Sequence, residues 1–306
     1  MQIATVTHRN GTEMTLAFVQ EGVFFSVNEI AADLGIESNF LDPLSVSWVS
    51  PDGLAFLNDL EKRRKAGLGV LDLDIWSITA PVLKPGKIVA VGRNYMDHVR
   101  EGQEIWAKRG RKVDIPTYPS AFAKFPSSLT GPFEPVTIPD GLNDIDYEIE
   151  LAVVIGKPAL SVSEAEAFSH VAGYCICNDL AARGIQRREM EQQIGITLAK
   201  NFPGFAPMGP WLTTADQIPD PQVLELRLDV DGDVRQQANT SDMIFPIAKL
   251  ISYFSQMGLE TGDILITGTP SGVALARPEP EAYYLKSGQV VTTWIEGLGE
   301  IKTEMR

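Results

Sequence analysis

The stretch of sequence that decides the fold is DYEIELAVVIGK, residues 146–157. Its second half, LAVVIG, is continuously apolar, which is typical of a central strand that is buried on both faces. Alternate side chains of a strand point to opposite faces, so Glu148 and Glu150 project on the same side, about 7 Å apart. Two carboxylates in such a place are costly unless a positive group neutralises them, and a hard cation bound by oxygen atoms does so. The alternative is an edge strand with a hydrated acidic face.

A third carboxylate follows a second apolar strand in GYCICNDLAARGIQRRE, residues 173–189. A helical pattern over about 179–195 would place Asp179, Arg183 and Gln186 on one helix face, because they are four and three residues apart. An acid, a guanidinium and an amide at the end of a strand form a pocket wall, in which Asp179 binds a metal and Arg183 binds a substrate carboxylate. The alternative is that Asp179 only caps the helix.

A candidate general base lies in GRNYMDHVREG, residues 92–102. His98 is one of three histidines in the chain, and Glu101 follows it by three residues. In a helical turn these two side chains meet, and the glutamate orients the imidazole and raises its basicity. The pair is therefore a candidate dyad for activating water. A surface ion pair is the alternative.

Two further elements indicate a function only in combination with the patterns described above. Lys200 is a cation in the apolar, proline-rich and glycine-rich stretch LAKNFPGFAPMGPW, where it would stabilise an oxyanion or donate a proton; exposure to solvent is the alternative. The run ITGTPSGVA, Ile266 to Ala274, is a Thr/Gly/Ser-rich loop after a strand. Its backbone N–H groups and hydroxyls could cradle a carboxylate, although a plain tight loop explains it equally well.

The composition limits the classes of protein to which the chain can belong. The formal net charge is −14, which argues against a nucleic-acid or membrane partner because both need a basic surface. The start MQIATVTHRN has no features of a secretory signal, and no apolar run approaches the roughly 20 residues that span a bilayer. Cys175 and Cys177 lie in an apolar segment, where we expect buried reduced thiols and therefore a cytoplasmic protein.

Two units of different character follow each other along the chain. Residues 1–79 predict a small N-terminal α/β domain, with strands in MQIATVT, EMTLAFV and VFFSV and a helix that Ser26 caps. Proline and glycine residues within 81–86 mark a joint. Short β-type runs dominate afterwards, with a further helical pattern at about 243–257. We therefore predict a β-rich α+β catalytic domain over residues 80–306.

Eight stretches, taken together and in order, resemble the fumarylacetoacetate hydrolase family. They are KIVAVGRNYMDHVRE, AFAKFPSSLTGP, DYEIELAVVIGK, AGYCICNDLAARGIQ, LAKNFPGFAPMGPW, NTSDMIFPIAKLI, LETGDILITGTPSGVA and SGQVVTTWIEGLGEI. The resemblance implies a mixed, β-sandwich-like roll with a short N-terminal extension. It also implies a homodimer, and an Mg²⁺ or Mn²⁺ ion near the open end of the roll.

The resemblance gives a role to each residue that the patterns single out. By motif match, the metal ligands are Glu148, Glu150 and Asp179. The catalytic residues are His98, Glu101 and Lys200. The substrate contacts are Arg183, Gln186, Thr267 and Thr269.

The reaction that the resemblance implies is chemistry on a small 2-oxo acid. Because His98 and Glu101 are both present, we favour hydrolysis of a C–C bond in a 2,4-dioxo acid of the acylpyruvate or fumarylpyruvate type, giving pyruvate and an organic acid. Decarboxylation of a substrate such as oxaloacetate, or isomerisation or hydration of a 2-hydroxydienoate such as 2-hydroxyhepta-2,4-diene-1,7-dioate, is the alternative. A non-catalytic binding protein on the same fold is a more remote one.

Two departures from the family pattern bear on the substrate. After Lys200, relatives often have Ser-Phe-Asp, whereas this chain has Asn201, Phe202 and Pro203. The segment 102–123 is longer and more basic than in compact members, and it lies where a lid would close over the substrate.

Overall fold

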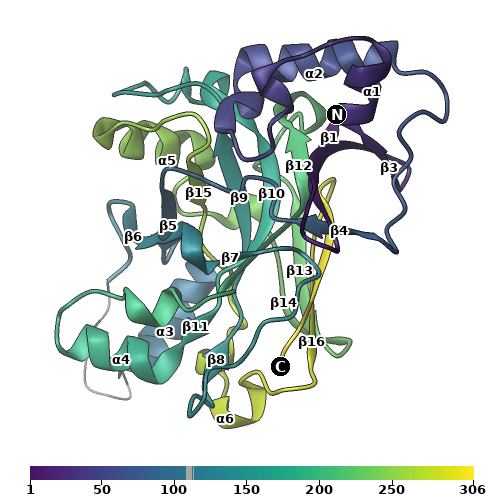
Figure 1. Cartoon of the computed structure of the whole chain (residues 1–306). Coiled ribbons are helices and arrows are strands. Elements are labelled where there is room, and N and C mark those ends of the chain that lie inside the picture. The colour runs from purple at the N-terminus through teal and green to yellow at the C-terminus, as the bar shows by residue number, and fades with distance from the viewer. Residues whose placement is uncertain (108–111, 113) are drawn as a thin grey trace.

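The computed structural model describes residues 1–107, 112 and 114–306 (Figure 1). Part of the predicted lid segment 102–123 therefore lies outside the described residues. The predicted β-rich α+β class is confirmed: two mixed or antiparallel sheets form the body of the molecule, and short helices lie around them.

The larger sheet runs in the order β3-β2-β1-β12-β10-β9-β15-β5-β6, with β4 paired to β1 and β7 paired to β12. Its strands are β1 (Gln2–His8), β2 (Met14–Gln20), β3 (Val23–Ser26), β4 (Trp76–Thr79), β5 (Ile88–Gly92), β6 (Ser120–Lys124), β7 (Leu129–Thr130), β9 (Ile149–Ile155), β10 (Val171–Asn178), β12 (Ala206–Thr214) and β15 (Ile264–Ile266). The predicted central strand is β9, which lies between β10 and β15 and is buried along its whole length.

A second sheet has the order β14-β13-β16-β17, and a short ribbon pairs β11 with β8. These strands are β8 (Ile145–Asp146), β11 (Ala181–Ala182), β13 (Glu225–Val230), β14 (Asp233–Asn239), β16 (Val290–Ile295) and β17 (Gly299–Glu304). The sequence patterns did not predict β12, β14 or β17. β12 was missed because its Met-Gly-Pro segment contains two residues that usually interrupt strands.

Alternate side chains of β9 face two different hydrophobic cores. Leu151 and Val153 belong to the core that contains Leu226 of β13. Ala152 and Val154 belong to the core that contains Leu57, from the second helix of the chain. A continuous run of apolar residues is required at this strand because both of its faces are covered.

The helices are α1 (Val27–Asp33), α2 (Pro51–Arg63), α3 (Met96–Ala107), α4 (Arg183–Glu191), α5 (Ile247–Phe254) and α6 (Pro280–Tyr283). Figure 1 shows α1 and α2 together at the top of the view, and α3 and α4 at the lower left. The predicted cap of α1 is confirmed, because the hydroxyl of Ser26 accepts a hydrogen bond from the backbone N–H of Glu29.

The predicted helix over 179–195 is wrong at its start. α4 begins at Arg183, and Asp179 lies outside it. The chain stays extended up to that point because Ala181 and Ala182 pair with β8, while the N–H of Asp179 donates to the carbonyl of Glu148. Asp179 therefore neither caps α4 nor shares a helix face with Arg183.

The N-terminal strands continue the larger sheet instead of forming a sheet of their own. Gln2 and Ile3 of β1 pair with Thr213 and Leu212 of β12. The predicted domain boundary at residue 80 stays a prediction, but the larger sheet contains strands from both sides of it.

Cys175 and Cys177 are buried free thiols, as predicted. None of the described helices is long and apolar enough to cross a membrane.

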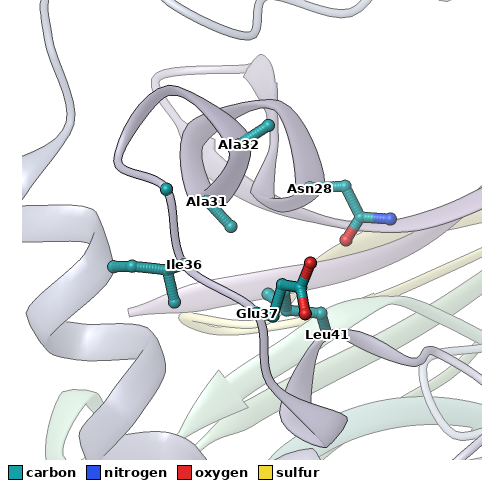
Figure 2. A pocket seen from close by; sticks show the side chains of 7 residues that line it. Asn28, Ala31, Ala32, Ile36, Glu37 and Leu41 are labelled. Atoms are coloured by element: carbon teal, nitrogen blue, oxygen red, sulfur yellow. The ribbon is translucent and has the colours of Figure 1, made fainter.

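A cavity of about 530 Å³ lies beside α1. Figure 2 shows the side chains that line it, among them Asn28, Ile36, Glu37 and Leu41. None of the predicted catalytic, metal-binding or substrate-binding residues lines this cavity.

We expect Gly173→Ala to destabilise the protein by about 1–3 kcal/mol, because overpacking of a filled interior costs that much. A Cβ atom at this position in β10 would lie 2.2 Å from the carbonyl oxygen of Thr213 in the neighbouring strand. Urea unfolding measures the loss. The matched control is Gly102→Ala, where an added Cβ meets no atom within 4 Å; equal stability of the two variants would contradict the prediction.

Candidate active site

Three carboxylates meet where β9 begins and β10 ends. Glu150 lies in β9, Glu148 directly precedes that strand, and Asp179 directly follows β10. The two strands are antiparallel neighbours, with Cys177 opposite Glu150, so the end of one lies beside the start of the other. One oxygen atom from each carboxylate lies within 4.8 Å of the others, and all three side chains are buried. We call these three residues the carboxylate cluster.

Three buried cations contact the carboxylate cluster. The Nζ atom of Lys200 lies 2.5 Å from Glu148 Oε2 and 2.8 Å from Asp179 Oδ2. Lys124 Nζ lies 2.7 Å from Asp179 Oδ1, and Arg183 Nη2 lies 2.6 Å from Glu148 Oε1. Lys200 is 1% exposed, so the alternative of a solvent-exposed lysine is excluded.

Glu148 and Glu150 differ sharply in their surroundings. Burial opposes ionisation of Glu148, but Lys200 and Arg183 beside it lower its pKa to about 2. Burial raises the pKa of Glu150 well above its ordinary value, and the charges of Asp179 and Glu148 raise it further. Its carboxylate accepts a hydrogen bond of 2.7 Å from the N–H of Gly268, and no ion pair to it is formed by the described residues. Glu150 is thus the carboxylate with the greatest need of a counter-ion.

Arg183 is held by three side chains. Its Nε atom lies 2.7 Å from Asp146 Oδ2, and its Nη1 atom donates to Gln186 Oε1 at 2.8 Å; Glu148 takes the third contact. The sequence patterns gave Asp146 no role. Its position two residues before Glu148, on the same side of the chain, was the signal that could have found it.

His98 and Glu101 meet on α3, as their spacing predicts. His98 Nδ1 lies 3.7 Å from Glu101 Oε2, which is an ion-pair distance and too long for a hydrogen bond. An electrostatic interaction with His98 contributes to lowering the pKa of Glu148, so the imidazole lies within electrostatic reach of the carboxylate cluster. Both oxygen atoms of Glu101 accept from the N–H of Gly272, at 3.0 and 3.1 Å.

The loop after β15 binds carboxylates of the protein itself. Backbone N–H groups of Gly268, Gly272 and Ala274 donate respectively to Glu150, Glu101 and Asp146. The composition left open whether this loop cradles a carboxylate, and the carboxylates that it contacts belong to the protein itself. The loop thereby connects β9, α3 and Asp146, which is the partner of Arg183, to one segment.

The hydroxyls of this loop also have partners within the protein. Thr267 donates to the carbonyl of Leu151 at 3.1 Å, and Thr269 Oγ1 accepts from Gln236 Nε2 at 2.8 Å. Gln236 is 1% exposed, and its Oε1 atom accepts from the N–H of Ile149. Contact of the two threonines with substrate stays a prediction. Gln236 went unnoticed in the sequence because the glutamine pair of β14, Gln236 and Gln237, carries no pattern that marks one of them as buried.

Lys124 and Asn201 were also missed. Lys124 ends β6 and contacts both Asp179 and the backbone carbonyl of Lys200; the patterns contain nothing that separates it from a surface lysine. Asn201 directly follows Lys200 in the sequence. Its amide accepts from the N–H of Phe125 at 2.5 Å and donates to the carbonyl of Ala123, so it fastens β6, and with it Lys124, to the Lys200 segment.

Comparison with known proteins gives one consistent result. The family model described as fumarylacetoacetate (FAA) hydrolase, C-terminal, matches residues 87–306. A relative from Burkholderia multivorans, named only as a hydrolase, is 44% identical over 224 residues. The match covers 73% of this chain and 75% of that one.

Solved structures of similar proteins cover the whole chain. A maleylpyruvate hydrolase from Sphingobium has a TM-score of 0.76 and 29% identity, and the match spans 100% of this chain and 99% of that one. A fumarylacetoacetate hydrolase from Exiguobacterium antarcticum has a TM-score of 0.74 and 28% identity over the same shares. On the length of the family match and the identity to its relatives, this chain belongs to the fumarylacetoacetate hydrolase family.

Proposed function

We propose that this protein is a divalent-metal-dependent enzyme that hydrolyses a C–C bond in a 2,4-dioxo acid of the acylpyruvate type. The observation that carries the proposal is the carboxylate cluster, in which Glu150 has no cationic partner among the described residues, together with the His98–Glu101 pair within electrostatic reach of it. The first feature suits a bound cation, and the second suits activation of water.

The donor atoms of the carboxylate cluster fit Mg²⁺ or Mn²⁺. All three are carboxylate oxygens, which these hard ions prefer. Glu148, Glu150 and Asp179 would hold the ion, which supplies Lewis acidity toward the carboxylate and 2-oxo oxygens of the substrate when it is bound. A related maleylpyruvate hydrolase, 28% identical, was solved with manganese(II) and pyruvate, which supports both the ion and the product.

The remaining residues would divide the work of hydrolysis. Arg183 and Gln186 orient the substrate carboxylate. His98, oriented by Glu101, takes a proton from water as the water oxygen attacks the 4-carbonyl carbon. The C3–C4 bond then breaks, its electron pair leaves on the pyruvate enolate, and the acyl group leaves as a carboxylic acid. Lys200 stabilises the enolate and donates the proton that C3 requires.

A second candidate is isomerisation of a 2-hydroxydienoate. A 2-hydroxyhepta-2,4-diene-1,7-dioate isomerase from Mycobacterium marinum matches the whole chain at 27% identity with a TM-score of 0.71. That reaction needs the same enolate stabilisation but no attacking water, so the His98–Glu101 pair favours hydrolysis. We also propose a homodimer, as the family resemblance implies, and a small-molecule 2-oxo acid as the partner.

We expect turnover of at least one 2,4-dioxo acid, with release of pyruvate, in the presence of Mg²⁺ and none with excess EDTA. Loss of enol absorbance from acetylpyruvate, fumarylpyruvate and maleylpyruvate measures it, and a coupled lactate dehydrogenase assay identifies the pyruvate. Turnover of a dienoate but of no dioxo acid would replace the hydrolase with the isomerase.

We expect Glu150→Gln to raise the thermal stability of the metal-free protein and to abolish stabilisation by Mg²⁺. The folded-state pKa of Glu150 is raised. The cost in stability therefore grows as the pH rises from the unfolded-state pKa of about 4.3 towards the folded-state pKa, and the full cost is present above both. An amide has no such cost, whereas an unsatisfied buried group costs about 1–3 kcal/mol and more when it is charged. Thermal unfolding at pH 7, with and without MgCl₂, measures both effects.

The matched control for this variant is Glu225→Gln, which alters an exposed carboxylate of β13. It should leave the stability and the Mg²⁺-dependent increase unchanged. An undiminished Mg²⁺ effect in Glu150→Gln would show that the carboxylate cluster is not the metal site.

We expect His98→Gln to lower kcat for C–C hydrolysis by about 10²- to 10⁴-fold, the usual contribution of a general base, with little change in KM. Steady-state kinetics on the best dioxo acid measure the loss, and His8→Gln, outside the site, is the control. Wild-type kcat in the variant would remove His98 from the mechanism.

A further inference from the structure

Gly272, in the loop after β15, contacts α3 through the carboxylate of Glu101. Gly272 has φ +104°, a conformation that side chains disfavour, and a Cβ atom there would lie 2.2 Å from the carbonyl oxygen of Arg235. No larger residue fits this close approach of two backbones. Because glycine is also the residue with the greatest backbone freedom, other contacts must fix its orientation.

Two side chains hold the carbonyl of Gly272. The hydroxyl of Tyr147 donates to it at 3.3 Å, and Arg277 Nη2 donates to it at 3.4 Å. The same Nη2 atom donates to the carbonyl of Arg235 at 2.7 Å, so Arg277 joins the two backbones that meet at the glycine.

The anchoring side chains are themselves fixed. Tyr147 is fully buried in the core beneath the second sheet. The guanidinium of Arg277 lies 5.4 Å from the ring centre of Tyr283, and that of Arg235 lies 4.6 Å from the same centre. The carbonyl side of Gly272 is thus held by a buried tyrosine and by an arginine that lies over the ring of Tyr283.

The N–H of Gly272 points the other way, toward the dyad. It donates to both carboxylate oxygens of Glu101. The N–H of Gly272 belongs to the peptide plane before its Cα atom, and the carbonyl belongs to the plane after it. Because the second plane is held, the N–H can move only by rotation about φ and ψ of Gly272.

We propose that Tyr147 and Arg277 are positioning residues for the water-activating dyad. They act through Gly272, whose N–H fixes the carboxylate of Glu101 beside His98; we call Glu101, Gly272, Tyr147 and Arg277 the clasp. The catalytic part of this inference rests on the proposed function, whereas the attachment of α3 to the loop does not.

The attachment is tested by backbone hydrogen exchange of the metal-loaded full chain, which needs no substrate. In Tyr147→Phe/Arg277→Gln, we expect the amides of α3 and of Gly272 to exchange about tenfold faster than in the wild type, since the contacts that hold the loop are lost. Glu101→Ala should accelerate α3 to a similar extent. Unchanged exchange of α3 in the double variant would overturn the clasp.

The catalytic role is tested by a mutant cycle with Glu101. We expect the double variant to lower kcat about tenfold at unchanged KM in the wild-type background, and to have no further effect in the Glu101→Ala background, since residues that act through Glu101 cannot add to its loss. An equal loss of kcat in both backgrounds would show that the two residues act by another route and would overturn the inference.

The matched control is Arg227→Gln/Tyr253→Phe, which makes the same two chemical changes on β13 and α5, outside the clasp. It should leave kcat and the exchange of α3 unchanged, and an equal effect in this control would overturn the assignment to Tyr147 and Arg277. If no 2,4-dioxo acid is turned over by the wild type, the proposed function fails, and the exchange experiment alone decides on the clasp.

Discussion

The structure depends on how four buried carboxylates are accommodated at one end of a central strand. Asp146, Glu148 and Asp179 are each contacted by a lysine or an arginine, whereas Glu150 accepts a hydrogen bond from the backbone N–H of Gly268. Three cations thus face four acids, and all seven side chains are buried. Charges in such a place are tolerated only when they are paired. The arrangement pairs three of the four acids and leaves Glu150 without a cationic partner among the described residues.

Much of this site could be predicted because its residues lie close together in the sequence. The alternation of Glu148 and Glu150 along an apolar strand, and the three-residue spacing of His98 and Glu101, are local patterns with direct geometric meaning. The apolar run of β9 likewise indicates burial on both faces. These patterns predicted the core of the fold and where the acids would gather.

The partners that arrive from distant segments could not be predicted. Lys124, Gln236 and Arg277 lie on separate elements, and nothing in their neighbourhoods distinguishes them from surface residues; only the topology of the sheets brings them to the site. The predicted start of the helix that became α4 was wrong for a related reason. Pairing of Ala181 and Ala182 with β8 holds the chain extended where the local pattern favours a helix. Tertiary contacts override local preference at such points.

The larger sheet contains strands from both sides of residue 80. The region that matches the family model therefore shares its sheet with the N-terminal strands. The family match begins at residue 87, yet the outer side of β12 is covered in part by β1. A shorter protein that began near the family boundary would present unpaired N–H and carbonyl groups of β12 to other chains, and such open edges invite intermolecular strand addition. The N-terminal strands therefore cover this edge of β12 and prevent other chains from pairing with it, whatever they contribute to the chemistry.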